Sequence, residues 1–155
     1  MSSLLLSFFD DLEAMTVSFV NKTGSTVTAN ALNIDEPADS IQTTHLPCRI
    51  ITSTAADTAV IQRGGNSTAT WNITDLFLLS TVAQDLGSYV ASPVLKRYEV
   101  AYIEALQKKW NLVHGWSTET LALNLSMLSG KFEYPSGSGV FFYGVKCDIT
   151  FEELV

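Results

Sequence analysis

Residues 69–110 constrain the possible fold more than any other part of this sequence. Residues 69–82 predict an apolar strand, and residues 76–79 are apolar on both of its faces, as in a strand covered on both sides. After a polar turn, Ser92-Pro93 opens an 18-residue helical pattern, because serine suits the N-cap and proline the first helical position. One side of this helix is apolar: Val94, Leu95, Tyr98, Tyr102, Ala105 and Leu106. A strand followed by an amphipathic helix predicts the largest packing unit of the chain.

The remaining sequence predicts elements that cover this unit. Leu5, Phe8, Phe9, Leu12 and Met15 recur at helical spacing, so a first helix is expected to end near Met15. Residues 16–20 fit either a last helical turn or a short strand. Short strands are expected at 26–29 and at 45–52, where Pro47 indicates an edge or a first position. Residues 53–67 read as irregular, because Gly64-Gly65 breaks any continuation.

The C-terminal third predicts two further strands joined by a long hairpin. Leu121, Leu123, Leu125 and Met127 alternate with smaller or polar residues, which indicates a half-buried strand. Residues 130–139 are rich in glycine and serine, so we expect them to form the hairpin tip. The last strand has one apolar face, made of Val145, Cys147, Ile149 and Phe151. The parity of Val140 and Phe142 is opposite, which predicts a bulge at Gly144.

The chain is expected to form a single domain over residues 1–155, of the α+β class. We predict a mixed, largely antiparallel sheet of about four to five strands, with two helices packed on one face and a long β-hairpin. At 155 residues and 46% hydrophobic content the chain can bury a sizeable core. No segment approaches the length of an apolar membrane span.

The charge of the chain restricts its partners. The net charge is −7, and this argues against binding to a nucleic-acid backbone, which requires a basic patch. Charged residues make up only 16% of the chain, against about 25% in a typical soluble domain. A surface with so few ions is easily buried against other proteins, because little charge must be desolvated. The alternative interpretation is simply a threonine-rich β domain.

Residues that could carry chemistry do not form a recognisable motif. The spacing His45-x-x-Cys48 supplies two metal ligands, and only His114 and Cys147 could complete the three or four that zinc requires. A cysteine nucleophile would need a histidine base, an orienting group and an oxyanion hole as well. We therefore predict no catalytic, cofactor-binding or metal-binding residues, and no enzyme activity. Cys48 and Cys147 are expected to be buried free thiols, with a single bridge as the alternative.

Two other groups are interpreted structurally. Asp10, Asp11 and Glu13 resemble a carboxylate pair, but on a surface helix such residues are more often solvated. Tyr98 and Tyr102 lie four positions apart, which indicates packing of the helix on the sheet rather than a ligand cage.

Three blocks of the sequence resemble one protein family. The first block is residues 33–47, with Asp35-Glu36, Thr43 and Leu46-Pro47 leading into a strand. The second is residues 74–84, a strand that runs into a loop before a helix. The third is residues 143–151, a glycine-containing final strand that acidic residues follow. Together with the order of the predicted elements, these blocks resemble the tail terminators of tailed bacteriophages, also called tail-completion or head–tail joining proteins.

The resemblance implies a structural virion protein. Such proteins form a ring, usually a hexamer, that caps the head-proximal end of the tail tube and joins it to the neck. The implied partners are further copies of the chain, the tail tube protein, and neck, connector or sheath proteins. DNA would pass through the bore without specific binding, no membrane is involved, and assembly would take place in the host cytoplasm. The alternatives are another neck, connector or tail-tube-related protein, and a monomeric small-ligand-binding domain.

Overall fold

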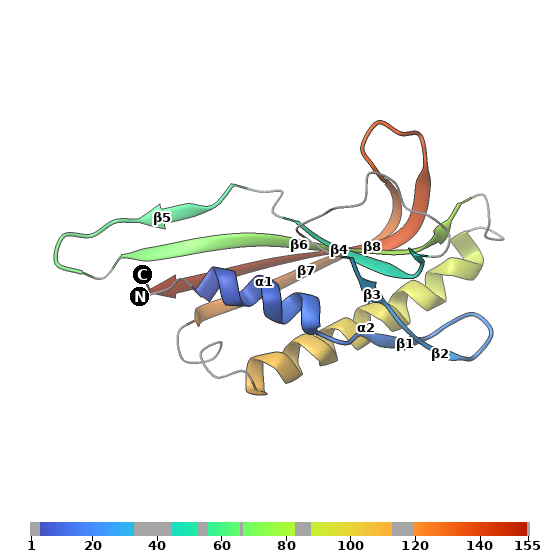
Figure 1. Ribbon diagram of the computed structural model, residues 1–155, viewed down its shortest axis with the longest axis horizontal. Helices are drawn as coiled ribbons and strands as arrows, with labels where there is room; N and C mark the ends of the chain where they lie inside the picture. The colour runs from blue at the N-terminus through green and yellow to red at the C-terminus, as the bar shows by residue number, and fades with distance from the viewer. Residues whose placement is uncertain are drawn as a thin grey trace.

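A computed structural model describes residues 4–32, 45–52, 56–65, 67–82, 88–112 and 120–154. These residues form an α+β fold, in which two helices pack against a largely antiparallel sheet (Figure 1). The predicted fold class is therefore confirmed. Among the described residues, no helix is both long enough and apolar enough to cross a membrane.

Six of the described strands form the main sheet, one or two more than expected. Its central strands, β6 and β8, pair antiparallel over nearly their whole length, and β4 and β7 flank them. Among the described strand pairs, β3–β4 alone is parallel. The strands are β3 (Asn30–Ala31), β4 (Cys48–Thr52), β5 (Thr58–Val60), β6 (Thr68–Thr81), β7 (Thr120–Glu133) and β8 (Phe141–Leu154). A separate ribbon contains β1 (Ser18–Val20) and β2 (Thr26–Thr28), so residues 16–20 end in a strand rather than a helical turn.

Both helices lie on one face of the sheet, as Figure 1 shows. Helix α1 (Leu4–Ala14) stacks Phe8 on Phe151 of β8, with 4.4 Å between ring centroids. Helix α2 (Ser88–Leu112) stacks Tyr98 on Phe77 of β6 at 3.7 Å. These aromatic contacts belong to the larger hydrophobic cluster, which also contains the predicted apolar faces of α2 and β8.

Helix α2 begins at Ser88, five residues before the predicted first helical position, so Pro93 lies inside the helix. Proline has no N–H to donate to the carbonyl four residues earlier, which costs the helix one backbone hydrogen bond. Burial of the apolar side of α2 offsets this loss, because Val94, Leu95, Tyr98, Tyr102 and Leu106 are all at most 3% exposed.

The opposite face of the sheet carries a second, smaller cluster. There the ends of β7 and β8 curl away from the helices (Figure 1) and bring Phe142 against Cys48, Ile50 and Leu78. The hairpin tip is shorter than expected, because β7 continues to Glu133 and only residues 134–140 connect it to β8. The curl therefore consists of paired strand rather than of a flexible loop.

The bulge expected at Gly144 lies in the partner strand instead. The register of β6 and β8 shifts between Leu78 and Ser80, so the extra residue belongs to β6. The opposite parity of Phe142 is ordinary strand alternation, which points its side chain into the second cluster. Gly144 has a different role, since a Cβ atom there would lie 2.1 Å from the carbonyl oxygen of Phe77.

Two further expectations need correction. Strand β5 falls in the segment that was expected to be irregular, and it pairs with the first residues of β6. Strand β4 lies inside the sheet between β3 and β6, so Pro47 does not mark an edge; it precedes the first strand residue. Its carbonyl oxygen accepts a hydrogen bond of 3.1 Å from the amide of Asn30.

Candidate functional site

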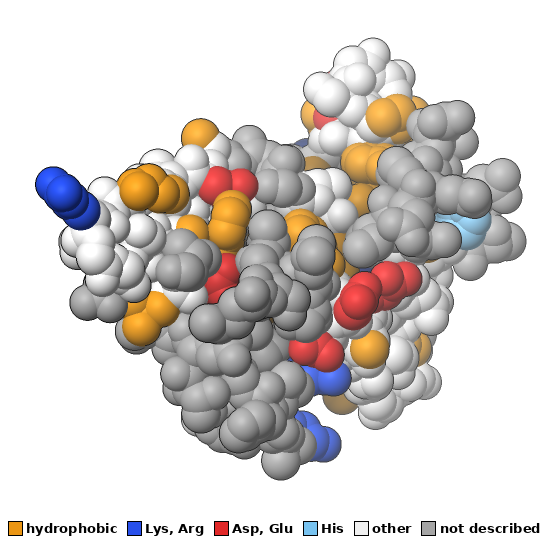
Figure 2. Space-filling model, turned by 60° about the vertical axis from the view of Figure 1, so that its left-hand side comes forward, with side chains coloured by type: hydrophobic (Ala, Val, Ile, Leu, Met, Phe, Trp, Pro, Cys, Tyr) orange, Lys and Arg blue, Asp and Glu red, His pale blue; other side chains and the backbone are white. Residues whose placement is uncertain are grey.

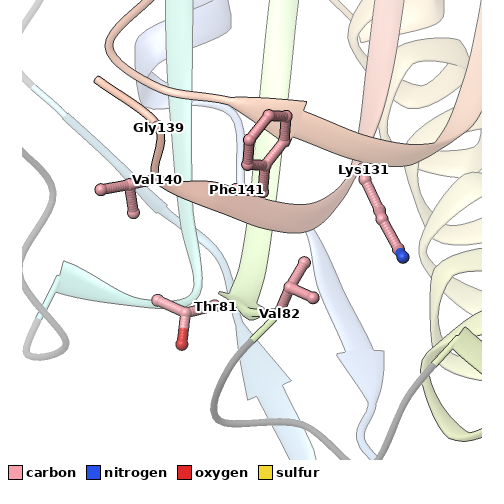
Figure 3. Close-up of a pocket in the computed structure, with 6 residues that line it drawn as sticks. All are labelled: Thr81, Val82, Lys131, Gly139, Val140 and Phe141. Carbon is pink, nitrogen blue, oxygen red and sulfur yellow. The ribbon is translucent and has the colours of Figure 1, made fainter. Parts of the chain in front are cut away.

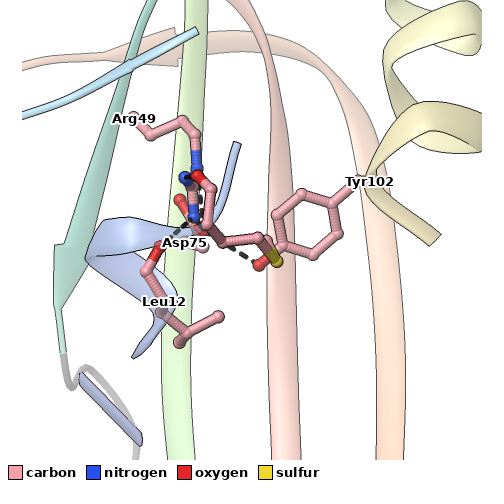
Figure 4. Close-up of polar contacts among 5 residues, drawn as sticks. Leu12, Arg49, Asp75 and Tyr102 are labelled. Carbon is pink, nitrogen blue, oxygen red and sulfur yellow. Dashed lines mark hydrogen bonds and ion pairs between the residues drawn. The ribbon is translucent and has the colours of Figure 1, made fainter. Parts of the chain in front are cut away.

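A buried arginine joins the helical layer to the sheet. Arg49 lies on β4 opposite Phe77, so its side chain points towards the helices, where it is 0% exposed. Its Nη1 donates to the carbonyl oxygen of Met15 at 2.7 Å, and its Nη2 donates to that of Leu12 at 2.9 Å (Figure 4). Leu12 lies in the last turn of α1 and Met15 directly follows the helix, where carbonyls lack the usual helical partner four residues later. Arg49 therefore caps α1 and fixes it to β4.

Asp75 of β6 balances the charge of Arg49. Its Oδ2 accepts hydrogen bonds from Nε of Arg49 at 3.1 Å and from the hydroxyl of Tyr102 at 2.9 Å. Burial disfavours the guanidinium charge, but the Asp75 carboxylate more than offsets this, so the pKa of Arg49 lies above its ordinary value. Burial raises the pKa of the Tyr102 hydroxyl, and the Asp75 charge raises it further. Near neutral pH the Arg49 guanidinium therefore stays charged and the Tyr102 hydroxyl stays protonated.

The Arg49–Asp75–Tyr102 cluster ties four elements together: α1, β4, β6 and α2. Its side chains are all 0% exposed, so no substrate can approach them in this arrangement. A buried, paired and hydrogen-bonded charge of this kind fixes how elements dock. Its role is thus to hold the two layers in one relative position.

The sequence did not single out Arg49 or Asp75, although a signal was present. Each is the one charged residue of its strand, and the two carry opposite signs. Buried charges are nearly always paired, so two such residues on different strands predict a partnership. The tyrosines were interpreted correctly as packing residues, since Tyr98 and Tyr102 are both fully buried between helix and sheet.

The structure separates the two cysteines instead of bringing them together. Both are buried free thiols, as predicted, but Cys48 belongs to the second cluster and Cys147 to the larger one, on opposite faces of the sheet. Burial raises the pKa of Cys48 to about 12, and it also raises the pKa of Cys147, with the Asp75 charge adding to the effect. Neither thiol is therefore activated as a nucleophile.

The other sequence candidates do not converge on one site. His45 is partly exposed just before β4, and His114 lies outside the described residues. Asp10 is exposed on α1, while Asp11 and Glu13 are partly exposed. In the part of the chain that the structure describes, no group of three or more His, Cys, Asp or Glu side chains is placed to hold a metal ion.

Two exposed surfaces of the described residues lie at opposite ends of β6. At the start of the strand, β5 and β6 form an arm that projects from the body (Figure 1), with Val60 56% and Ile61 80% exposed. Figure 2, which brings this end forward, shows hydrophobic side chains in the open. At the end of the strand lies a cavity of about 700 Å³. It is lined by Thr81, Val82, Lys131, Gly139, Val140 and Phe141.

The cavity is mainly apolar and its walls come from three strands. Val140 and Phe141 approach from the curled hairpin, Thr81 and Val82 from the end of β6, and Lys131 from β7 (Figure 3). Lys131 carries the one charge among these six lining residues, and its Nζ lies 5.8 Å from the ring centroid of Tyr143. Such a site offers apolar contact and a single cation, which suits recognition of an apolar group beside an anion.

Comparison of the chain with protein-family models, with curated proteins and with solved structures found no match.

Proposed function

We propose that this chain is a structural virion protein of the tail-terminator kind, which assembles with copies of itself into a ring. In the family it resembles, the ring is usually a hexamer at the head-proximal end of the tail tube. The observation that carries the proposal is the projecting β5–β6 arm, whose apolar side chains Val60 and Ile61 are 56% and 80% exposed. A monomer gains nothing from exposing such a segment, whereas a subunit interface buries it.

The electrostatics and the buried cluster agree with a structural role. A net charge of −7 lets DNA slide through a bore, because like charge weakens adhesion. The most elaborate polar arrangement in the described residues, around Arg49 and Asp75, fixes the docking of α1 and faces no solvent. The proposed partners are the tail tube protein on one side of the ring and neck, connector or sheath proteins on the other, in a virion assembled in the host cytoplasm.

The mass of the purified chain in solution tests this proposal. Light scattering coupled to size exclusion is expected to give a mass of several chains. Deleting residues 135–139 from the hairpin tip should lower that mass to one chain, because the deletion removes Gly139 and alters the exposed cavity that it lines at the end of β6. The substitution Ser136→Ala, which keeps the length of the tip, serves as the control and should leave the mass unchanged. A wild-type chain that stays monomeric at high concentration would refute the ring.

The alternative from a different class is a monomeric small-ligand-binding domain. The cavity of about 700 Å³ supports it, because ligand sites commonly enclose roughly 300–1,000 Å³. Under this alternative the chain is monomeric and binds an apolar fluorescent probe at this cavity, and Val140→Asp abolishes that binding. Another neck, connector or tail-tube-related protein remains the alternative within the structural class, and it shares the prediction of self-assembly.

A further inference from the structure

The two exposed surfaces have complementary chemistry. The first, here called the arm patch, consists of the exposed Val60, Ile61 and Leu154 together with the partly exposed Glu152. Val60 and Leu154 flank Thr68 on either side in the strand register, so they share one face of the sheet. Leu154 is 52% exposed, and Glu152 lies two residues before it on the same face. The arm patch is therefore apolar, with the partly exposed carboxylate of Glu152 at its border on the sheet and the exposed Arg63 in the turn beyond Ile61.

The second surface, here called the end pocket, is the cavity lined by residues 81, 82, 131 and 139–141. Its apolar side chains are also exposed, although less than those of the arm, since Val140 and Phe141 are each 45% exposed. Its single charge is the cation of Lys131. Both surfaces are apolar, and Glu152 at the border of the arm patch is opposite in charge to Lys131 at the end pocket. Opposite charges across an interface favour one partner and one register of docking.

One copy of the chain cannot bring its own arm patch into its own end pocket. The arm pairs with Thr68–Thr70 at the start of β6, whereas the end pocket uses Thr81, the last residue of the same strand. A strand of this length separates its ends by roughly 40 Å. The two surfaces can meet only between different copies.

We infer that the arm patch of one subunit docks into the end pocket of the next, with Glu152 facing Lys131 across the contact. This inference rests on the proposed ring and names its subunit interface. The contact is heterologous, because each subunit uses two different surfaces, and such head-to-tail contacts close into a ring when the rotation between neighbours permits. A symmetric two-fold dimer would instead use one surface twice.

Two variants with one broken surface each test the inference. Ile61→Asp places a charge on the arm patch, and Val140→Asp places one in the end pocket. Val100→Asp is the matched control, because Val100 is 57% exposed on α2 and belongs to neither surface. Circular dichroism and the thermal midpoint establish that each variant is folded before its mass is measured.

Each broken variant alone is expected to have the mass of one chain, and the control the mass of the wild type. An equimolar mixture of the two broken variants should reach the mass of two chains and stop there, because it contains one intact arm patch and one intact end pocket. If the wild type is assembled and the variants are too, or if their mixture stays monomeric, the inference is wrong while the ring stands. A monomeric wild type would overturn both.

Chemical crosslinking provides a second measurement that breaks neither surface. A chain that carries both Ile61→Cys and Val140→Cys should give a ladder of multiply linked chains with a short bis-maleimide, whereas either substitution alone should not. The native thiols do not interfere, because Cys48 and Cys147 are both buried. Absence of the ladder from an assembled double variant would place the subunit contact elsewhere.

Discussion

Arg49 and Asp75 form an ion pair in which both side chains are 0% exposed. The guanidinium also donates to the carbonyls of Leu12 in α1 and of Met15 just after it, so the pair links a helix, two strands and, through Tyr102, a second helix. Removing one partner of such a pair leaves an uncompensated charge in the core, which is far more costly than the net value of the pair itself. This asymmetry gives the first prediction.

Asp75→Asn should lower the free energy of unfolding by about 3–5 kcal/mol, because it leaves Arg49 charged and unpaired in the core. Replacing both residues, as in Arg49→Met with Asp75→Leu, should cost less than the sum of the two single changes. Urea unfolding of the wild type, Arg49→Met, Asp75→Leu and the double variant measures the coupling energy. Strictly additive losses would contradict a direct interaction between the two side chains.

The two buried tyrosines of α2, Tyr98 and Tyr102, should respond differently to loss of the hydroxyl. Tyr102→Phe removes a hydrogen bond of 2.9 Å to the Asp75 carboxylate and should cost about 1.5–3 kcal/mol. Within the described residues, the buried Tyr98 hydroxyl has no hydrogen-bond partner, so Tyr98→Phe should be neutral or stabilising. Thermal and urea unfolding of both variants decide the matter, and equal losses would refute the distinction.

Gly144→Ala should be strongly destabilising, because the new Cβ atom would lie 2.1 Å from the Phe77 carbonyl oxygen and would push β6 and β8 apart. We expect a loss on the order of 3 kcal/mol, at the upper end for overpacking. Gly130 pairs directly with Gly144 across β7 and β8, yet nothing lies within 4 Å of a Cβ atom there. Gly130→Ala is thus the matched control and should change stability by less than about 1 kcal/mol.

The buried thiols predict a loss of stability in alkali. The folded state holds the Cys48 pKa at about 12, above its ordinary value of 9.0, so the folded chain binds a proton that the unfolded chain releases. Stability from this group is complete below pH 9 and falls between pH 9 and about pH 12, by about 1.4 kcal/mol per pH unit. Urea unfolding at several pH values should show this slope, and Cys48→Ala should reduce it. A chain equally stable at pH 8 and pH 10.5 would contradict the prediction.

The sequence allowed a prediction of the elements whose side chains alternate or recur over many residues. The apolar face of Val145, Cys147, Ile149 and Phe151 is buried as expected, because a long strand with one covered face has a strong period-two signal. Helix α2 was predicted from its apolar side, whose residues recur at spacings of three and four. Its true start was missed, because Ser92-Pro93 is a good local start signal that burial of the whole helix overrides.

Features that depend on contacts between distant segments could not be predicted in this way. Strand β5 has only three residues, all exposed, and it exists because β6 offers an edge to which it can pair. The bulge was placed in the wrong strand, because the parity of one strand cannot show which of two partners carries the extra residue. Arg49 and Asp75 are 26 positions apart, and only the register of β4 and β6 brings them together.

Strand β6 is one continuous strand that begins at the projecting arm, passes the buried Asp75 and ends at the cavity. Nearly all of its length is hydrogen-bonded to β8, so β6 is held straight and cannot extend easily. A force applied to the arm is therefore transmitted along β6, and the Arg49–Asp75 ion pair connects this strand to the helical layer. Under tension the chain should yield first at the three-residue β5 pairing, before the central sheet shears.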